Sequence, residues 1–174
     1  MTETVKQYTE RILSNVKEEP LVILSATPQR IQKQIDGLSA EILRHRPTPE
    51  QWSVAEITAH LADAEIVAAF RIRKILSEPG CAIAAYDQNA WAEKLTYSRS
   101  DAHQNAKHFS LLREMNLALL RGLSAEEWER HGIHSERGQE SVRRVVTLYA
   151  GHDVNHLHQI EKIVKSIREL SRAS

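Results

Sequence analysis

Apolar residues recur every three or four positions along most of this chain, which is the period of an amphipathic α-helix. Capping residues indicate where helices start: Ser53 and Glu56 form a capping box, and Ser141 precedes the last apolar stretch. Thr27 is expected to cap the second part of the first helix, with Pro28 in its first turn. The four major helices that we predict are 5–37 with a break, 54–77, 101–122 and 142–170.

Shorter elements are expected between these helices. Helical turns are predicted near 39–43, 88–95 and 124–130, the second of them capped by Asp87. The polar, glycine-punctuated segment 131–139 is predicted to be a loop, and no alternating run indicates a β-strand. The pattern therefore predicts an all-α fold, an antiparallel four-helix bundle with extra short helices, in a single domain over residues 1–174.

Composition narrows the class of protein. The chain has 174 residues, with 23 lysines and arginines against 23 acidic residues, so its formal net charge is zero. Nucleic-acid binding depends on a cationic excess and is not expected. No stretch approaches the ~20 apolar residues of a membrane span, and no secretory signal is visible, which predicts a cytoplasmic location. Cys81 is the single cysteine, so neither an internal disulfide nor a thiolate zinc site is expected.

The last predicted helix carries two histidines within its apolar stripe. Val145 and Tyr149 precede them, and Ile160 follows them, at the same three-to-four spacing. Four residues advance a helix by about 400°, so His152 and His156 lie one above the other and face the interior. Buried imidazoles need polar partners, and a histidine pair at i, i+4 is a known metal-binding spacing.

A metal site inside a bundle also needs a ligand from a facing helix. His60 lies at the edge of the apolar stripe of helix 54–77, between small alanine neighbours that leave room for a cavity. We therefore predict one divalent metal ion per chain, bound by His60, His152 and His156. His158 is about 200° round the helix from His156 and should face away. The alternative is that these histidines are hydrogen-bonded core residues without a metal.

Several segments resemble one known family. GHDVNHLHQI at Gly151–Ile160 is similar to the His-Asp-x-x-His-x-x-Gln-Ile signature of the DinB/YfiT-like superfamily. WSVAEITAHLADAE at Trp52–Glu65 resembles that family's tryptophan-serine capping segment and its His-Leu-x-Asp motif. The segments Ala85–Tyr97 and His134–Gly138 look like connecting segments of one branch. The similarity covers nearly the whole chain in the same order.

The resemblance implies a four-helix bundle that is often a homodimer. It also implies a divalent ion, nickel or zinc in relatives, bound by three histidines that correspond to His60, His152 and His156. Some members of the family transfer low-molecular-weight thiols to electrophiles, and others are described as metal-dependent hydrolases. The family's name refers to DNA-damage induction, which concerns regulation and does not imply DNA binding.

Three imidazoles would leave the ion with open positions, which is typical of a catalytic site. Such an ion lowers the pKa of a bound water or thiol to about 7, so a metal-bound water or thiolate is the expected nucleophile. Asp63, Asp153 and Tyr149 are candidates for orienting the ligands or contacting a substrate, although each has an ordinary structural reading as well.

Two functions follow from this site. The first is a metal-dependent enzyme, either a thiol S-transferase or a hydrolase, acting on a small electrophilic substrate. The alternative is a non-catalytic metal-binding module that serves in stress response or assembly. The sequence names neither the substrate nor the native metal, because three histidines accept several divalent ions.

Overall fold

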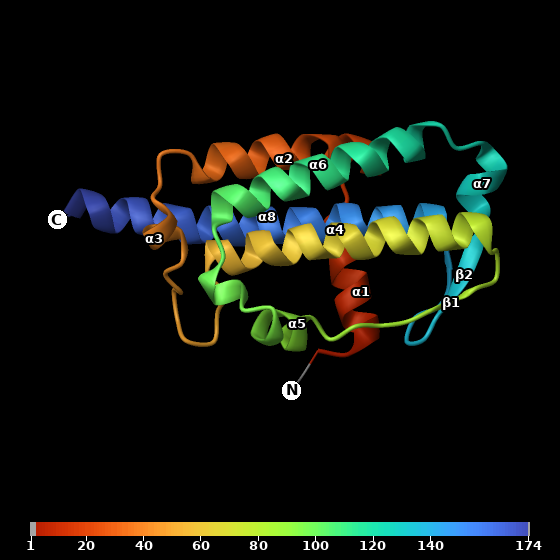
Figure 1. Cartoon of the computed structure of the whole chain (residues 1–174), viewed down its shortest axis with the longest axis horizontal. Helices are drawn as coiled ribbons and strands as arrows, with labels where there is room; N and C mark the ends of the chain where they lie inside the picture. Colours follow the sequence, from red (N-terminus) through yellow and green to blue (C-terminus); the bar gives the residue numbers. More distant parts are fainter. Residues whose placement is uncertain (1–2, 174) are drawn as a thin grey trace.

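The computed structural model of the protein describes the backbone of residues 3–173 and the side chains of residues 3–169. Four long helices, α2 (Pro20–Ile35), α4 (Val54–Ser77), α6 (Ala102–Arg121) and α8 (Val142–Ala173), lie side by side along one axis (Figure 1). The predicted all-α four-helix bundle is therefore confirmed. No helix in the described part of the chain has the length and apolar character needed to cross a membrane.

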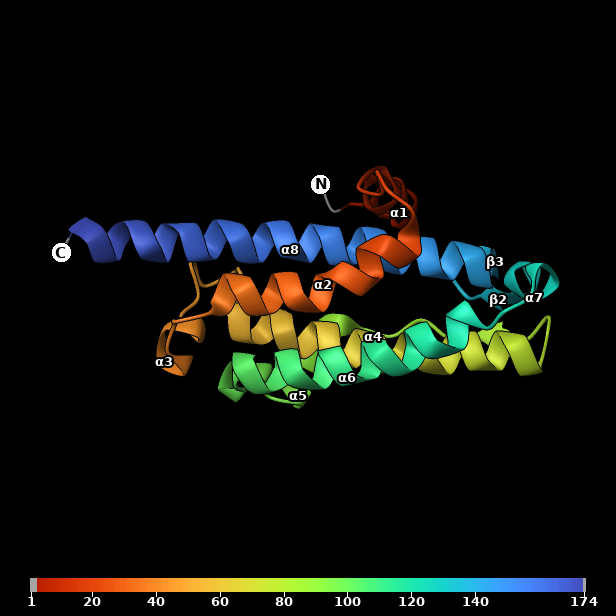
Figure 2. The same ribbon diagram turned by 90° about the horizontal axis from the view of Figure 1, so that it is seen from above.

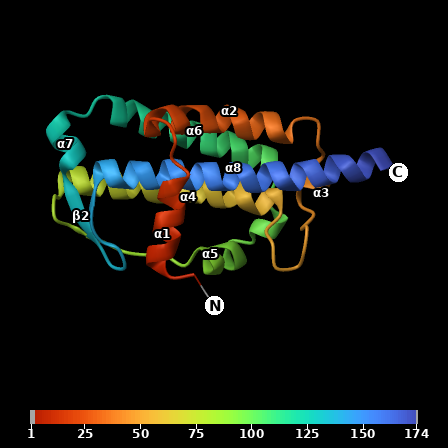
Figure 3. The same cartoon turned by 180° about the vertical axis from the view of Figure 1, so that it is seen from behind.

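Helix α1 (Val5–Ser14) does not continue into the bundle. It lies across α8 at a steep angle, so that it is seen almost end-on in Figure 2 and lengthwise over α8 in Figure 3. Its N-cap is Thr4, which forms a capping box with Gln7. The crossing leaves room between α1, α8 and the loops beside them, and the cavity described below lies there.

The predicted start of the second helix at Thr27 and Pro28 is wrong. Helix α2 begins at Pro20, after Glu19 as N-cap, and Pro28 lies inside it. A proline in a helix interior removes the hydrogen bond to the carbonyl four residues earlier, which here belongs to Leu24. Arg113 Nη1 donates to that carbonyl oxygen at 2.9 Å. A distant side chain thus replaces the missing bond, and the helix continues.

Local capping signals give the other helix boundaries. The Ser53 capping box is present at the start of α4, and Asp101 caps α6. The short helices follow the prediction closely, including the Asp87 cap: α3 (Ala40–Leu43), α5 (Gln88–Lys94) and α7 (Ala125–Glu129). A single 3₁₀ turn at Tyr97–Arg99 precedes α6.

The prediction of a loop over residues 131–139 is wrong, because part of this segment forms a β-hairpin. Strands β2 (His131–His134) and β3 (Gly138–Ser141) pair antiparallel, and β1 (Ala82–Ile83) pairs parallel with β2. Strands of two to four residues are too short to show an alternating pattern in the sequence. Gly138 has a φ of +74° at the end of the hairpin turn, which favours glycine there.

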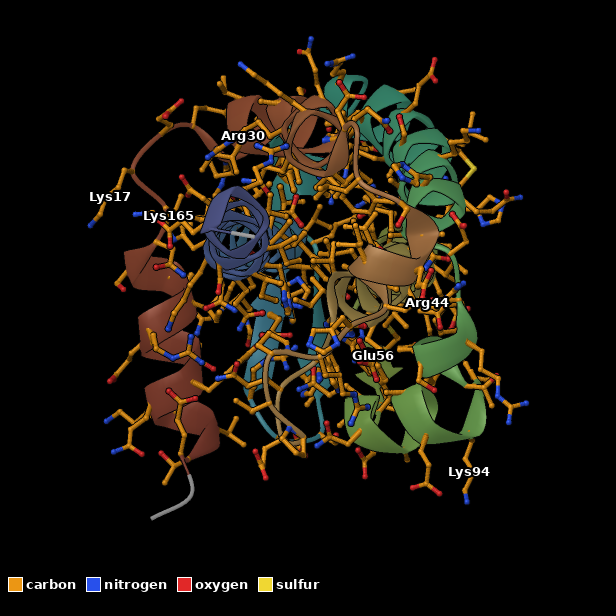
Figure 4. The ribbon with its side chains drawn as sticks, turned by 90° about the vertical axis from the view of Figure 1, so that its left-hand side faces the viewer. Lys17, Arg30, Arg44, Glu56, Lys94 and Lys165 are labelled. Atoms are coloured by element: carbon orange, nitrogen blue, oxygen red, sulfur yellow. The ribbon has the colours of Figure 1, made fainter. Side chains whose placement is uncertain are left out.

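The core consists of two apolar clusters separated by a buried polar layer. In that layer, Arg113 donates to Asp153 at 2.6 Å and to Glu65 at 2.8 Å, and Asn116 also donates to Glu65. Figure 4 looks along the helices and shows side chains filling the space between them, with lysines such as Lys94 on the outside. Because Glu65, Arg113 and Asp153 stand on α4, α6 and α8, the polar layer joins three of the four long helices.

Candidate metal centre

Three histidines from two helices converge inside the bundle. His60 is on α4, and His152 and His156 are one turn apart on α8. The Nε2 atom of His152 lies 2.9 Å from that of His60 and 3.1 Å from that of His156. One ring nitrogen from each residue lies within 4.8 Å of the other two, so the three side chains have the arrangement of a candidate metal site.

The surrounding residues hold these rings in place. His60 is 1% exposed and its ring centroid is 5.1 Å from that of Trp52, at a tilt of 53°. His152 and His156 have ring centroids 4.4 Å apart, as expected for neighbours one turn apart on a helix. His158, expected to face away, is exposed. Helical spacing and burial therefore select two of the three histidines in the segment 152–158.

Burial keeps the three imidazoles neutral. The pKa values of His60 and His152 are held well below the ordinary value, mainly because burial penalises the charged form. Burial likewise lowers the pKa of His156 to about 4, against a smaller opposing effect of its hydrogen bond to Gln159. Metal ions bind the neutral form of histidine, so all three side chains are in the binding form at pH 7.

Gln159 orients one of the rings. Its Oε1 atom accepts a hydrogen bond of 2.8 Å from Nδ1 of His156, which leaves Nε2 of that ring without a proton and facing the other two histidines. Gln159 was not among the residues predicted for this site, although it stands in the motif at Gly151–Ile160. Nδ1 of His152 is buried and has no hydrogen-bond partner in the described part of the chain.

Of the three residues predicted to assist the site, Asp63 and Asp153 contact other partners, and Tyr149 lies beside the histidines. The hydroxyl of Tyr97 donates to the carboxylate of Asp63, which is a cross-link between α4 and the 3₁₀ turn. Asp153 is paired with Arg113 in the polar layer. Tyr149 is closer to the site, with its ring centroid 6.2 Å from that of His152. The structure thus gives Asp63 and Asp153 structural contacts and leaves only Tyr149 beside the histidines.

The donor set fits a divalent transition metal. Zinc binds imidazole nitrogens at about 2.0–2.1 Å, which places two nitrogens of a tetrahedral site about 3.3 Å apart. The Nε2 separations of 2.9 and 3.1 Å are close to this value. Two neutral nitrogens that face each other need a shared proton or a cation, and a single ion satisfies all three at once.

A cavity of about 370 Å³ opens beside the histidines and reaches His152. Its walls come from α1, α4, α8, the loop that precedes α5, and the hairpin turn. Tyr8, Tyr86 and Tyr149 contribute aromatic surface, and Arg71 and His134 contribute polar groups. This size is typical of a small-molecule site. His60 and His156 are not among the residues that line the cavity.

Comparisons with known proteins agree with this picture. Residues 23–160 match the family model of the DinB superfamily. OB0782 of Oceanobacillus iheyensis is 26% identical over 159 residues, which cover 91% of this chain and 92% of that protein. YfiT of Bacillus subtilis is 24% identical over 158 residues, covering 88% and 87%. Both are named, provisionally, as metal-dependent hydrolases. The solved structure of YfiT superposes with a TM-score of 0.79 at 20% identity, over 95% of this chain and 90% of that one.

Proposed function

This chain belongs to the DinB superfamily, and we propose that it is a metal-dependent enzyme that acts on a small electrophilic substrate. One observation carries the proposal: three neutral imidazoles converge at one point, and a cavity of small-molecule size reaches one of them. The names of the relatives agree with a metal requirement and with hydrolysis.

The protein's own residues supply a binding site and the shape of a cavity. His60, His152 and His156 would hold the ion, and Gln159 fixes the orientation of His156. A divalent ion bound in this way provides Lewis-acid chemistry and activates a nucleophile at neutral pH. The protein ligands number three, fewer than a closed structural zinc site requires. The cavity side of His152 is where a substrate would approach.

Two nucleophiles fit the proposal. Water would give hydrolysis, and a low-molecular-weight thiol would give transfer of the thiol to the electrophile. Cys81 is not proposed as a nucleophile, because it lies in the loop before β1 and does not line the cavity. We propose nickel or zinc as the ion, one per chain, because imidazole ligands suit both. The cytoplasmic location stays a prediction.

Metal content is the first test. Protein purified without a nickel column should contain about one divalent ion per chain by elemental analysis. His60→Ala and His156→Ala should lose it, whereas His158→Ala, an exposed neighbour on the same helix, should keep it. A wild-type protein that binds no nickel or zinc after refilling would end the proposal.

Activity is the second test and separates the two nucleophiles. Activated esters and alkyl halides are presented to the metal-loaded protein with and without a panel of bacterial thiols. Turnover without thiol indicates hydrolysis, and turnover only with thiol indicates transfer. Stoichiometric metal with no turnover in either arm would favour the non-catalytic metal-binding module instead.

For partners, we propose a second copy of this chain and no nucleic acid. Large apolar side chains are exposed on neighbouring turns of α4 and α6: Ile66, Phe70, Leu111 and Met115. Their exposed fractions are 50%, 65%, 65% and 47%, and such contiguous apolar surface commonly marks a protein–protein contact. The helices α4 and α6 pack against each other, Ile66 and Leu111 line one surface pocket together, and none of the four residues lines the cavity that reaches His152.

A further inference from the structure

Arg71 differs from the other buried charged side chains that the structure describes. Each of the others forms an ion pair: Glu56 with Arg46, Glu140 with Arg137, and Glu65 and Asp153 with Arg113. Arg71 is 7% exposed, and no carboxylate of the described residues pairs with it.

The contacts of Arg71 leave its charge uncompensated. One guanidinium nitrogen donates to the backbone oxygen of Ala84 at 2.8 Å, and the group lies over the ring of Tyr86 at 5.8 Å. A buried charge is costly unless it is paired. Two parallel N–H groups of a guanidinium match the two oxygens of a carboxylate, or two oxygens of a phosphate. The side chain lines the cavity beside the histidines.

His134 supplies a second donor in the same cavity. The residue is 2% exposed, and its Nδ1 atom accepts a hydrogen bond from the backbone N–H of Glu136 at 3.2 Å. Burial lowers the pKa of the imidazole, so the ring is neutral at pH 7 and its proton is on Nε2. That Nε2 atom is buried and has no hydrogen-bond partner in the described part of the chain. It is a donor without an acceptor.

The acidic residues around the cavity do not compensate for these donors. Glu3 is paired with Arg11, and Asp87 accepts the backbone N–H groups that open α5. Glu136 lines the cavity but is exposed. A guanidinium without a counter-ion and an N–H without an acceptor therefore lie on the same cavity, and an anionic oxygen group is the complement of both.

We propose that Arg71 and His134 form an anion subsite, which binds a carboxylate or phosphate group of the substrate while its reactive part lies near His152. This inference rests on the proposed function, and it narrows the substrate class to small molecules that carry such an oxyanion. Arg137 also lines the cavity, but its charge is already paired, because its Nε and Nη2 atoms donate to the two carboxylate oxygens of Glu140 at 2.7 and 2.8 Å. It shapes the wall and is not assigned to the subsite.

The test uses three probes of similar shape: benzoate, phenyl phosphate and the neutral benzamide. Their binding to the full-length protein is measured by calorimetry, first after chelation of metal and then after loading with zinc. We expect at least one of the two anions to bind ten-fold or more tighter than benzamide in the chelated protein. Benzoate and phenyl phosphate then distinguish carboxylate from phosphate. Equal binding of all three probes by the wild type would overturn the proposal.

Variants assign the preference to the two residues. Arg71→Met should remove most of it, and His134→Phe should weaken anion binding several-fold while keeping a ring in place. Lys74→Met is the control, because it removes the same charge from the next turn of α4 without touching the cavity. Persistence of the anion preference in Arg71→Met would refute the assignment. If that variant does not fold, the wild-type comparison and His134→Phe still decide.

The same samples separate this inference from the proposed function. Zinc content is measured in each variant, and Arg71→Met should keep one ion per chain because it leaves the three histidines intact. An anion preference in a protein that binds no metal would leave the subsite standing and remove the enzyme proposal. Full metal content without an anion preference would remove the subsite and leave the enzyme proposal standing.

Discussion

Gly151 lies where α1 crosses α8, and its replacement by alanine tests how closely the two helices must pack. An alanine Cβ there would lie 2.1 Å from the backbone oxygen of Ile12 and 2.9 Å from its carbonyl carbon. Asn15 also donates from Nδ2 to the carbonyl oxygen of Gly151, at 3.3 Å. The contact joins two backbones, so rotation of a side chain cannot relieve the overlap.

Two effects of opposite sign compete in Gly151→Ala. Helix propensity favours alanine over glycine by about 1 kcal/mol. Against this, the 2.1 Å between the added Cβ and the Ile12 oxygen must increase to an ordinary contact of about 3.5 Å. Helix α1 therefore has to move away from α8 by more than ~1 Å. Such overpacking costs about 1–3 kcal/mol, and Ile12, which is 1% exposed, loses contacts as α1 moves. We expect a net decrease of about 1–2 kcal/mol in the free energy of unfolding.

Urea unfolding of the chelated protein measures this difference. Gly122→Ala is the matched control, because its nearest neighbour would be the Leu119 oxygen at an ordinary 3.6 Å. That control should be neutral or up to about 1 kcal/mol more stable. Zinc content should not change in Gly151→Ala, since α1 supplies none of the three histidines. A Gly151→Ala protein as stable as the wild type would refute the close packing of α1 on α8.

Four further results are expected. Gln159→Ala should weaken zinc binding by about 10–100-fold in a chelator competition, because His156 loses its orienting partner, and Gln159→Glu should restore an acceptor. The chelated protein should lose stability as pH falls from about 6.5 towards 4. In this range the unfolded state takes up protons that buried His156, with its pKa of about 4, does not, so each such histidine contributes about 1.4 kcal/mol per pH unit; urea midpoints that do not change with pH would contradict this. Arg113→Met should cost about 3–5 kcal/mol in urea unfolding, because Glu65 and Asp153 are left buried and unpaired; a neutral result would show that the polar layer is solvated. Phe70→Asp should convert a dimer to a monomer by light scattering, whereas a wild type that is already monomeric would remove the proposed partner face.

The sequence predicted the elements whose signals are local. Helix α4 starts and ends where expected because Ser53 and Glu56 cap its first turn, and Pro79 and Gly80 follow its C-cap residue, Glu78. The start of α2 was misplaced because the usual cost of Pro28 is offset by Arg113, which lies far away in the sequence. The hairpin at 131–141 was missed because each of its strands has only four residues, and β2 also gains a second partner from β1, about fifty residues earlier.

The candidate site divides in the same way. His152 and His156 were readable because a helical repeat places both on one face, and His60 lies on the apolar stripe of a helix that packs against theirs. For Asp63 and Asp153, which were expected to orient the ligands, the structure gives hydrogen bonds to Tyr97 and Arg113. Spacing along a helix gives the direction of a side chain, but it does not give the partner that meets it.

Arg71 and Arg113 show why the cavity could not be predicted. Both are arginines on long helices among apolar residues, and nothing in their neighbouring sequence separates them. Their difference appears only when the chain is folded: Arg113 meets two carboxylates and a carbonyl, whereas Arg71 meets a carbonyl, an aromatic ring and the cavity. A charge that the fold itself neutralises serves stability. A buried charge that the fold leaves without a counter-ion, on a cavity that reaches a cluster of three histidines, is a place for the opposite charge of a bound molecule.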